Sequence, residues 1–117
     1  MSKSDIRLFF AGDFCSKPST SLITVEDELK GLIHSCDIGV INFEVPLRPQ
    51  NMMPYKGRYV QFYQNDDTPL FLRDLGFSLF SIANNHTFDW GIKGFKKTQT
   101  MLGIDSCFGA GHYDEAY

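Results

Sequence analysis

The stretch Phe77-Ser-Leu-Phe-Ser-Ile-Ala-Asn-Asn-His-Thr-Phe-Asp-Trp-Gly91 joins a short apolar run to a polar turn, and this junction decides the fold class. Residues 77–83 are apolar and bounded by turn-forming residues, which predicts a buried β-strand. The residues that follow the turn predict a helix, with inward side chains Ile92, Phe95 and Leu102. A buried strand followed by a polar turn and a helix is the repeating unit of α/β proteins.

The same unit occurs twice upstream of this stretch and begins again after it. Thr24 is expected to cap a first helix that runs to about residue 35, with Asp27 three residues after the cap. Thr68-Pro69 is expected to start a second helix, which ends at Gly76. Strands that alternate with helices predict an α/β fold with a mostly parallel sheet, flanking helices and right-handed crossovers. The expected strands are residues 6–11, 37–43, 77–83 and 107–108.

The composition is that of a small, acidic, globular chain. It has 117 residues, a formal net charge of −3 and eleven Phe. Its one short basic cluster consists of Lys93, Lys96 and Lys97 and is expected to be a solvated helix face. We therefore expect no nucleic-acid partner. No apolar run is long enough to span a membrane, and the first residues lack the features of a secretory signal. Three scattered cysteines fit a reducing compartment, so the sequence predicts a cytoplasmic location.

Three polar clusters fall where the expected strands end. They are Gly12-Asp13, then Asn42-Phe43-Glu44, and then Asn84-Asn85-His86 followed by Asp89. Ligands bind at the carboxyl edge of parallel α/β sheets, and clusters from successive strands meet there. Carboxylate and amide oxygens beside a histidine suit a divalent metal such as Mn, Mg, Fe or Zn. Two carboxylates can hold one ion or bridge two, so the clusters predict a site for one or two divalent ions.

Each of these residues also has an ordinary structural role. Asp13 and Asn84-Asn85 are typical turn residues, the asparagines because they tolerate left-handed backbone conformations. Glu44 could be a solvated acid in a loop. Asp89 lies where an N-cap of the next helix is expected, but it could instead orient His86 through a hydrogen bond.

The order and spacing of these clusters resemble those of a known family. The CapA proteins of poly-γ-glutamate capsule biosynthesis are similar in these segments: Gly12-Asp13, residues 42–44, Ala83–Gly91, Thr98, residues 109–111 and Glu115-Ala116. That family is similar in fold to the calcineurin-like metallophosphoesterases. The resemblance covers almost the whole chain, and residues 83–91 are its most specific segment.

The resemblance implies a role for each matching residue. Asp13 matches the first metal-ligand motif, Glu44 matches the carboxylate expected to bridge two ions, and Asn85 matches a ligand of the second ion. His86 matches the histidine that steadies the substrate phosphate or the leaving oxygen. Asp89 is the second candidate catalytic residue because of its position, from which it could contact substrate or orient His86.

Two departures from the wider fold limit what the resemblance implies. Cys15 stands where that fold has a histidine in the first motif, so it is either a metal ligand or a small buried residue. The second half of the fold supplies further metal-binding histidines, whereas only His86 lies in a matching motif here. Residues 1–117 are therefore expected to form a single, partial domain that resembles the N-terminal half of a four-layer sandwich.

Two functional hypotheses and one structural expectation follow from the resemblance. The first is a divalent-metal-dependent, phosphoesterase-like site that acts on a phosphoester substrate. The second is a non-catalytic capsule-assembly component that binds an anionic polymer through residues 45–54 and the aromatic side chains after them. The third is an inactive fragment, in which an apolar sheet face left uncovered by half a sandwich drives self-association. For a longer native protein, the resemblance also implies association with the cell envelope.

Overall fold

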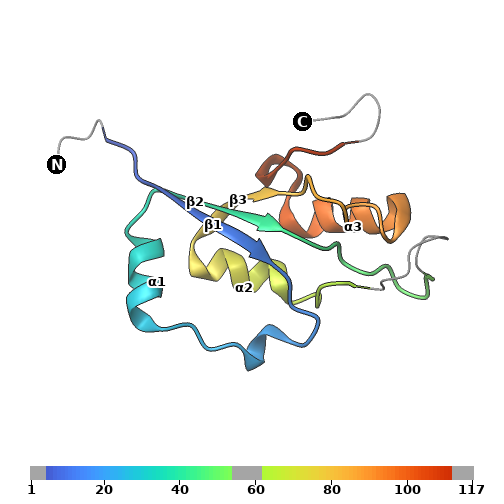
Figure 1. Cartoon of the computed structure of the whole chain (residues 1–117), viewed down its shortest axis with the longest axis horizontal. Helices are drawn as coiled ribbons and strands as arrows, with labels where there is room; N and C mark the ends of the chain where they lie inside the picture. The colour runs from blue at the N-terminus through green and yellow to red at the C-terminus, as the bar shows by residue number, and fades with distance from the viewer. Residues whose placement is uncertain (1–4, 54–61, 112–117) are drawn as a thin grey trace.

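The computed structural model describes residues 5–53 and 62–111, and it has the α/β architecture that the sequence predicts (Figure 1). Its strands are β1 (Leu8–Phe14), β2 (Ile38–Phe43), β3 (Phe77–Ser81) and β4 (Cys107–Phe108). Its helices are α1 (Asp27–His34), α2 (Thr68–Leu75) and α3 (Gly91–Leu102), with short 3-10 turns at Thr20–Leu22 and Ile104–Ser106. In the part of the chain that the structure describes, no helix has the length and apolar character needed to cross a bilayer.

The four strands form one parallel sheet in the order β1-β2-β3-β4. Each strand lies on the same side of the one before it, so every connection moves across the sheet in the same direction. Right-handed connections of this kind all pass over the same face of the sheet, which places the three helices together on that face. The core agrees with this arrangement. One buried cluster contains Ile33 of α1, Leu72 of α2 and Phe95 of α3, together with Ile41 and Phe80 of the strands.

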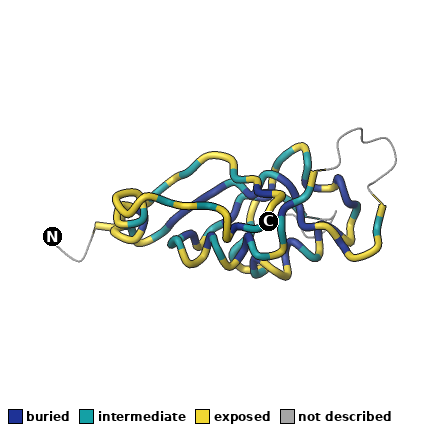
Figure 2. The backbone as a smooth tube through the Cα atoms, turned by 90° about the horizontal axis from the view of Figure 1, so that it is seen from below, coloured by how far each residue is buried: buried dark blue, intermediate teal, exposed yellow. Residues whose placement is uncertain are grey.

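The opposite face of the sheet carries apolar side chains that lie outside this core. The strand register places Phe10 beside Val40, and Val40 beside Leu79, in one row across the sheet. None of the three belongs to the buried cluster under the helices, and Phe10 is 70% exposed. Leu8 and Phe108 are 50% and 40% exposed. Figure 2 shows the buried segments running through the middle of the flattened molecule, bounded by exposed loops.

The first strand is displaced along the chain from its predicted position. β1 ends at Phe14 rather than at residue 11, because Phe14 pairs with Phe43 of β2 and its ring packs 5.9 Å from the ring of Phe71. The register of β1 against β2 shifts between Phe10 and Asp13, which accommodates the extra residues. Asp13 therefore lies inside the strand, near its carboxyl end, instead of after it.

Two helix predictions were also wrong in detail. Thr24 does not cap α1: the helix begins at Asp27, its N-cap is Glu26, and no side chain caps it. Acidic residues in the first turn favour this later start, because they interact well with the positive end of the helix dipole. In α3, Phe95 and Leu102 point inward as predicted, but Ile92 is exposed because it lies in the first turn, at the border of the buried face.

The long connection between β2 and α2 is held against the sheet by a buried glutamine. The Gln64 amide nitrogen donates to the main-chain oxygens of Phe14 at 3.0 Å and Val45 at 3.1 Å. Leu47 forms a parallel bridge with Gln64 in the same region. These contacts fix both ends of the connection at the carboxyl edge of the sheet. Within this connection the sequence also predicts a short strand at residues 59–63, of which residues 59–61 lie outside the described residues.

The end of α2 depends on a glycine, as the sequence predicts. Gly76 has φ 111°, in the left-handed region, and a Cβ built there would lie 3.0 Å from side-chain carbons of Ile33 and His34. Only glycine adopts this conformation without strain, and the turn brings the chain directly into β3.

We therefore expect Gly76→Ala to lower the free energy of unfolding by about 1–2 kcal/mol, the usual cost of a left-handed non-glycine residue. Gly31→Ala in α1 is the matched control, because its Cβ would meet nothing within 4 Å. It should raise stability by about 0.5–1 kcal/mol, since alanine loses less backbone freedom in a helix. Urea unfolding monitored by circular dichroism measures both. Equal midpoints for the two variants would contradict this account.

Candidate functional site

The predicted polar clusters meet at the carboxyl ends of β1, β2 and β3. Asp13 of β1 pairs in register with Asn42 of β2, which pairs in turn with Ser81 of β3. Glu44 follows β2 immediately, as predicted, and residues 84–86 follow β3. The parallel topology thus brings together residues that are about thirty to forty positions apart in the chain.

The side-chain amide of Asn42 joins the two candidate carboxylates. Its nitrogen donates to Asp13 Oδ1 at 2.7 Å and to Glu44 Oε2 at 2.6 Å. Because both bonds share one nitrogen, the two carboxylate oxygens lie close to each other. Asn42 belongs to one of the polar clusters of the sequence but was not predicted as a site residue. Its position two residues before Glu44, hence on the same face of the extended chain, is the signal that would have found it.

Asn84 anchors the turn after β3 to the end of β2. Its amide nitrogen donates to the main-chain oxygen of Phe43 at 2.9 Å and lies 3.4 Å from Asn42 Oδ1. Its side-chain oxygen accepts the backbone N–H of His86 at 3.0 Å. Neither Asn84 nor Asn85 has a positive φ, so the left-handed turn expected as their ordinary role does not occur. Asn84 instead positions His86 relative to the two carboxylates.

His86 is oriented by Asp89. His86 Nδ1 lies 2.6 Å from Asp89 Oδ2, and Asp89 is only 1% exposed. The N-cap interpretation of Asp89 was wrong, because Trp90 occupies that position of α3 and no side chain caps the helix. A carboxylate accepts the proton of Nδ1, which leaves Nε2 as the ring atom that can serve a ligand. Asn85 Nδ2 lies 3.4 Å from that nitrogen, which agrees with an acceptor at Nε2.

Cys15 is less well suited to hold a metal than its neighbours. It is exposed, so the prediction of a small buried residue was wrong. Partial burial of the thiol and the nearby Glu44 carboxylate both raise the pKa of Cys15. Without a metal the thiol is therefore protonated at neutral pH, and it would have to lose that proton to act as a ligand.

The donor set at this edge fits a divalent cation that prefers oxygen ligands. Asp13 and Glu44 supply two carboxylates that share one amide donor, and the Asn85 side chain lies in the next turn, with its nitrogen 3.4 Å from His86 Nε2. Over residues 5–53 and 62–111, no three His, Cys, Asp or Glu side chains form a group that could hold a metal. The possible ligands among the described residues are therefore two carboxylates and side-chain amides. This set suits Mg²⁺ or Mn²⁺ better than a metal ion that prefers thiolate ligands.

An aromatic side chain from the long connection borders the site. The ring of Phe62 lies 6.3 Å from the imidazole of His86 in an edge-to-face arrangement. The main-chain oxygen of Phe62 accepts the indole N–H of Trp90 at 2.7 Å. The aromatic side chains that follow residue 54 were predicted to contact an anionic polymer. Of these, Phe62 lies beside His86, whereas Tyr55 and Tyr59 lie outside the described residues.

The fold and this site define the chain as an α/β protein with an oxygen-rich, histidine-containing cluster at the carboxyl edge of a parallel sheet. Residues 7–116 match the family described as bacterial capsule synthesis protein PGA_cap. The chain belongs to that family. It is also similar to the PGA biosynthesis protein CapA of Bacillus subtilis (strain 168), with 32% identity over 57 residues. That match covers 49% of this chain and 15% of the length of the relative.

The orientation of His86 by Asp89 can be tested directly. Asp89→Ala should convert the neutral imidazole from the Nδ1–H form to a mixture of tautomers, because no carboxylate then holds the proton on Nδ1. Long-range ¹H–¹⁵N correlation spectra of the ring under basic conditions report the tautomer. Asp105→Ala, which removes an exposed acid in the turn after α3, is the control for the change in charge. An unchanged His86 spectrum in Asp89→Ala would refute the orienting role.

Proposed function

We propose that the cluster formed by Asp13, Asn42 and Glu44 belongs to a divalent-cation site, and that this site gives a capsule synthesis protein a phosphoesterase-like active centre. The observation that carries the proposal is the single Asn42 nitrogen that donates to both carboxylates. Two acids held this close repel each other, and a cation between them would relieve that repulsion. The adjoining His86, oriented by a buried carboxylate, supports a catalytic rather than a purely structural role.

In this proposal the chain's own residues bind and orient the substrate. Asp13 and Glu44 hold the cation, and Asn85 contributes a further oxygen. A bound divalent ion supplies positive charge for a phosphate group and lowers the pKa of a coordinated water. Asp89 keeps a proton on His86 Nδ1, so Nε2 is the atom that takes up or delivers a proton at the leaving oxygen.

Support for a capsule polymer as the wider context comes from the family rather than from the site. The family is described as bacterial capsule synthesis, and the Bacillus subtilis relative is named a PGA biosynthesis protein. We extend this context to the present chain and propose that it acts on, or binds beside, the anionic polymer poly-γ-glutamate. The alternative function is non-catalytic polymer binding, which the cationic cleft described in the next subsection favours.

The cation site predicts a specific loss of metal binding. Glu44→Gln should weaken Mn²⁺ binding by about tenfold or more, because a neutral amide replaces one of two carboxylate ligands. Isothermal titration calorimetry measures the affinity. Glu28→Gln, an exposed acid in the first turn of α1, is the matched control and should bind Mn²⁺ like the unmodified chain. Equal affinities for both variants would remove Glu44 from the site.

The enzymatic part of the proposal needs its own assay. The native full-length protein should hydrolyse bis(4-nitrophenyl) phosphate in the presence of Mn²⁺, and Glu44→Gln should lose that activity. Retained Mn²⁺ binding without hydrolysis would favour the polymer-binding alternative. Equal turnover by both proteins would exclude Glu44 from the reaction.

The uncovered sheet face supports the expected self-association of this chain. The sheet face opposite the helices exposes the apolar side chains of Leu8, Phe10 and Phe108. Val40 lies in the middle of that face and is buried. Burial of apolar surface stabilises by roughly 25 cal/mol per Å², so this face favours pairing with a second copy of residues 1–117, or with the second half of the domain in a longer protein.

Sedimentation velocity should therefore show dimers or larger species at micromolar concentration, and Phe10→Ser should shift the distribution to monomer. Phe88→Ser, which replaces another exposed Phe on the turn before α3, is the matched control. A monomer for the unmodified chain at high concentration would contradict the prediction.

A further inference from the structure

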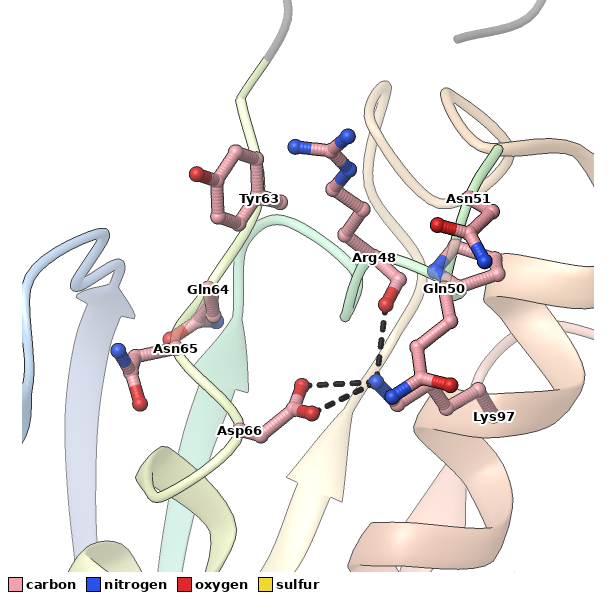
Figure 3. A pocket seen from close by; sticks show the side chains of 9 residues that line it. Arg48, Gln50, Asn51, Tyr63, Gln64, Asn65, Asp66 and Lys97 are labelled. Atoms are coloured by element: carbon pink, nitrogen blue, oxygen red, sulfur yellow. Dashed lines mark hydrogen bonds and ion pairs between the residues drawn. The ribbon is translucent and has the colours of Figure 1, made fainter. Parts of the chain in front are cut away.

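A polar cleft lies between the first part of the long connection, its last part and α3. Its volume is about 450 Å³. Figure 3 shows Tyr63 on one side of the cleft and Arg48, Gln50 and Asn51 on the other, with Lys97 of α3 below them. The cleft takes no part in the metal site proposed above.

Arg48 is held in this cleft by two aromatic rings. Its guanidinium carbon lies 5.4 Å from the centre of the Tyr63 ring and 5.3 Å from the centre of the Trp90 ring. The two rings contact each other edge to face, with 5.9 Å between their centres. Stacking on aromatic faces leaves the N–H groups at the rim of a guanidinium available for hydrogen bonds. Arg48 is therefore pre-oriented for a ligand.

The backbone that carries Arg48 is fixed on both sides. The Leu47 N–H donates to Thr98 Oγ1 of α3 at 2.9 Å, and both Leu47 and Pro49 are buried. Close packing against α3 requires Gly94, because a Cβ there would lie 2.5 Å from Trp90 Cβ and 3.3 Å from the main-chain oxygen of Leu47. No sequence pattern predicted the role of Gly94, and Thr98 was identified only through the family resemblance.

The charges in the cleft favour an anion. Lys97 Nζ donates to Asp66 at 2.8 Å and to the main-chain oxygen of Arg48 at 2.8 Å, so the expected solvated role of Lys97 was wrong. Asp66 offsets the charge of Lys97. No carboxylate in the described part of the chain forms an ion pair with Arg48. The lining therefore keeps one uncompensated positive charge, next to the side-chain amides of Gln50 and Asn51. Lys17 adds a second cation above Tyr63, at 5.0 Å from the ring centre.

We propose that this cleft binds oxyanion groups of a flexible polyanion, and specifically the carboxylates of a polycarboxylate chain, with the guanidinium of Arg48 as the bidentate donor. Planar forked recognition of carboxylates is what a pre-oriented guanidinium does best. The choice of a polycarboxylate rests on the proposed function, whereas the anion site itself rests only on the contacts described here.

The position of the cleft gives the proposal a functional meaning. Tyr63 follows Phe62, whose ring lies against His86, and Trp90 follows Asp89, which orients His86. The walls of the cleft and of the candidate metal site are therefore made of consecutive residues. A polymer held by Arg48 adjoins His86, so the cleft acts as a holding subsite beside the site of reaction.

The test measures binding of fluorescein-labelled poly-γ-glutamate by fluorescence anisotropy in the presence of EDTA. Removal of divalent ions leaves only binding that does not need the candidate metal site. Arg48→Gln should weaken this binding by about tenfold, the usual effect of losing a charge-assisted bidentate pair. Arg48→Lys should lose most of the affinity as well, because lysine keeps the charge but lacks the fork. Lys93→Gln removes one charge from the exposed side of α3 and should leave the affinity unchanged.

A further variant moves the affinity in the opposite direction. Asp66→Asn should tighten binding severalfold, because Lys97 then contributes its charge to the polymer instead of to Asp66. This variant also keeps the test decisive if circular dichroism shows that Arg48→Gln is unfolded. Labelled polyphosphate is the second arm: weaker binding than poly-γ-glutamate supports a carboxylate site, and tighter binding overturns that choice.

The outcomes separate this inference from the proposed function. Unchanged affinity in both Arg48 variants, or an equal loss in Lys93→Gln, would overturn the cleft as a specific site. Loss of EDTA-resistant binding in the Arg48 variants supports the cleft, whether or not Glu44→Gln affects Mn²⁺ binding. A Glu44→Gln variant with normal Mn²⁺ affinity contradicts only the metal site.

Discussion

The parallel pairing of β2 with both of its neighbours is the constraint on which the rest of the structure depends. It aligns Asp13, Asn42 and Ser81 in one row at the carboxyl edge, where side chains from three strands meet. The same pairing, with strands in sequential order, sends every crossover over one face. One half of the sheet surface is therefore a helix-covered core, and the other half presents Phe10 and Leu8 to the outside.

Asparagine side chains connect this framework to the site. The Asn42 nitrogen bonds both candidate carboxylates, and Asn84 bonds β2 with one end and the backbone of His86 with the other. An amide both donates and accepts, so it can hold acids and a main-chain N–H in one network without adding charge. The histidine is in turn fixed by the buried Asp89. The candidate carboxylates and the histidine are thus positioned by the neutral amides of Asn42 and Asn84 and by the buried carboxylate of Asp89.

The candidate metal site and the cationic cleft have opposite electrostatic characters, and neighbouring residues of the chain contribute to both. The metal site presents two carboxylates, whereas the cleft presents Arg48 and Lys97 against a single acid. An anionic polymer would be repelled by the first without a cation and attracted by the second in any case. Arg48 lies over the rings of both Tyr63 and Trp90, and Trp90 directly precedes α3, the helix that follows His86.

Local patterns in the sequence determined the order of strands and helices and the end of α2 at a glycine. They also placed Asp13, Glu44 and residues 84–86 near strand ends. All of these features depend on the spacing of apolar residues along the chain and on the backbone preferences of single residues. Family membership was likewise readable from residues 83–91 and their spacing. Tertiary contacts alone decided that β1 extends to Phe14, that Asp89 orients His86 instead of capping α3, and that Asn42 joins the carboxylates. They also assembled the Arg48 cleft from three segments distant in the chain. A side chain's partner across space depends on register and packing, which no local pattern encodes.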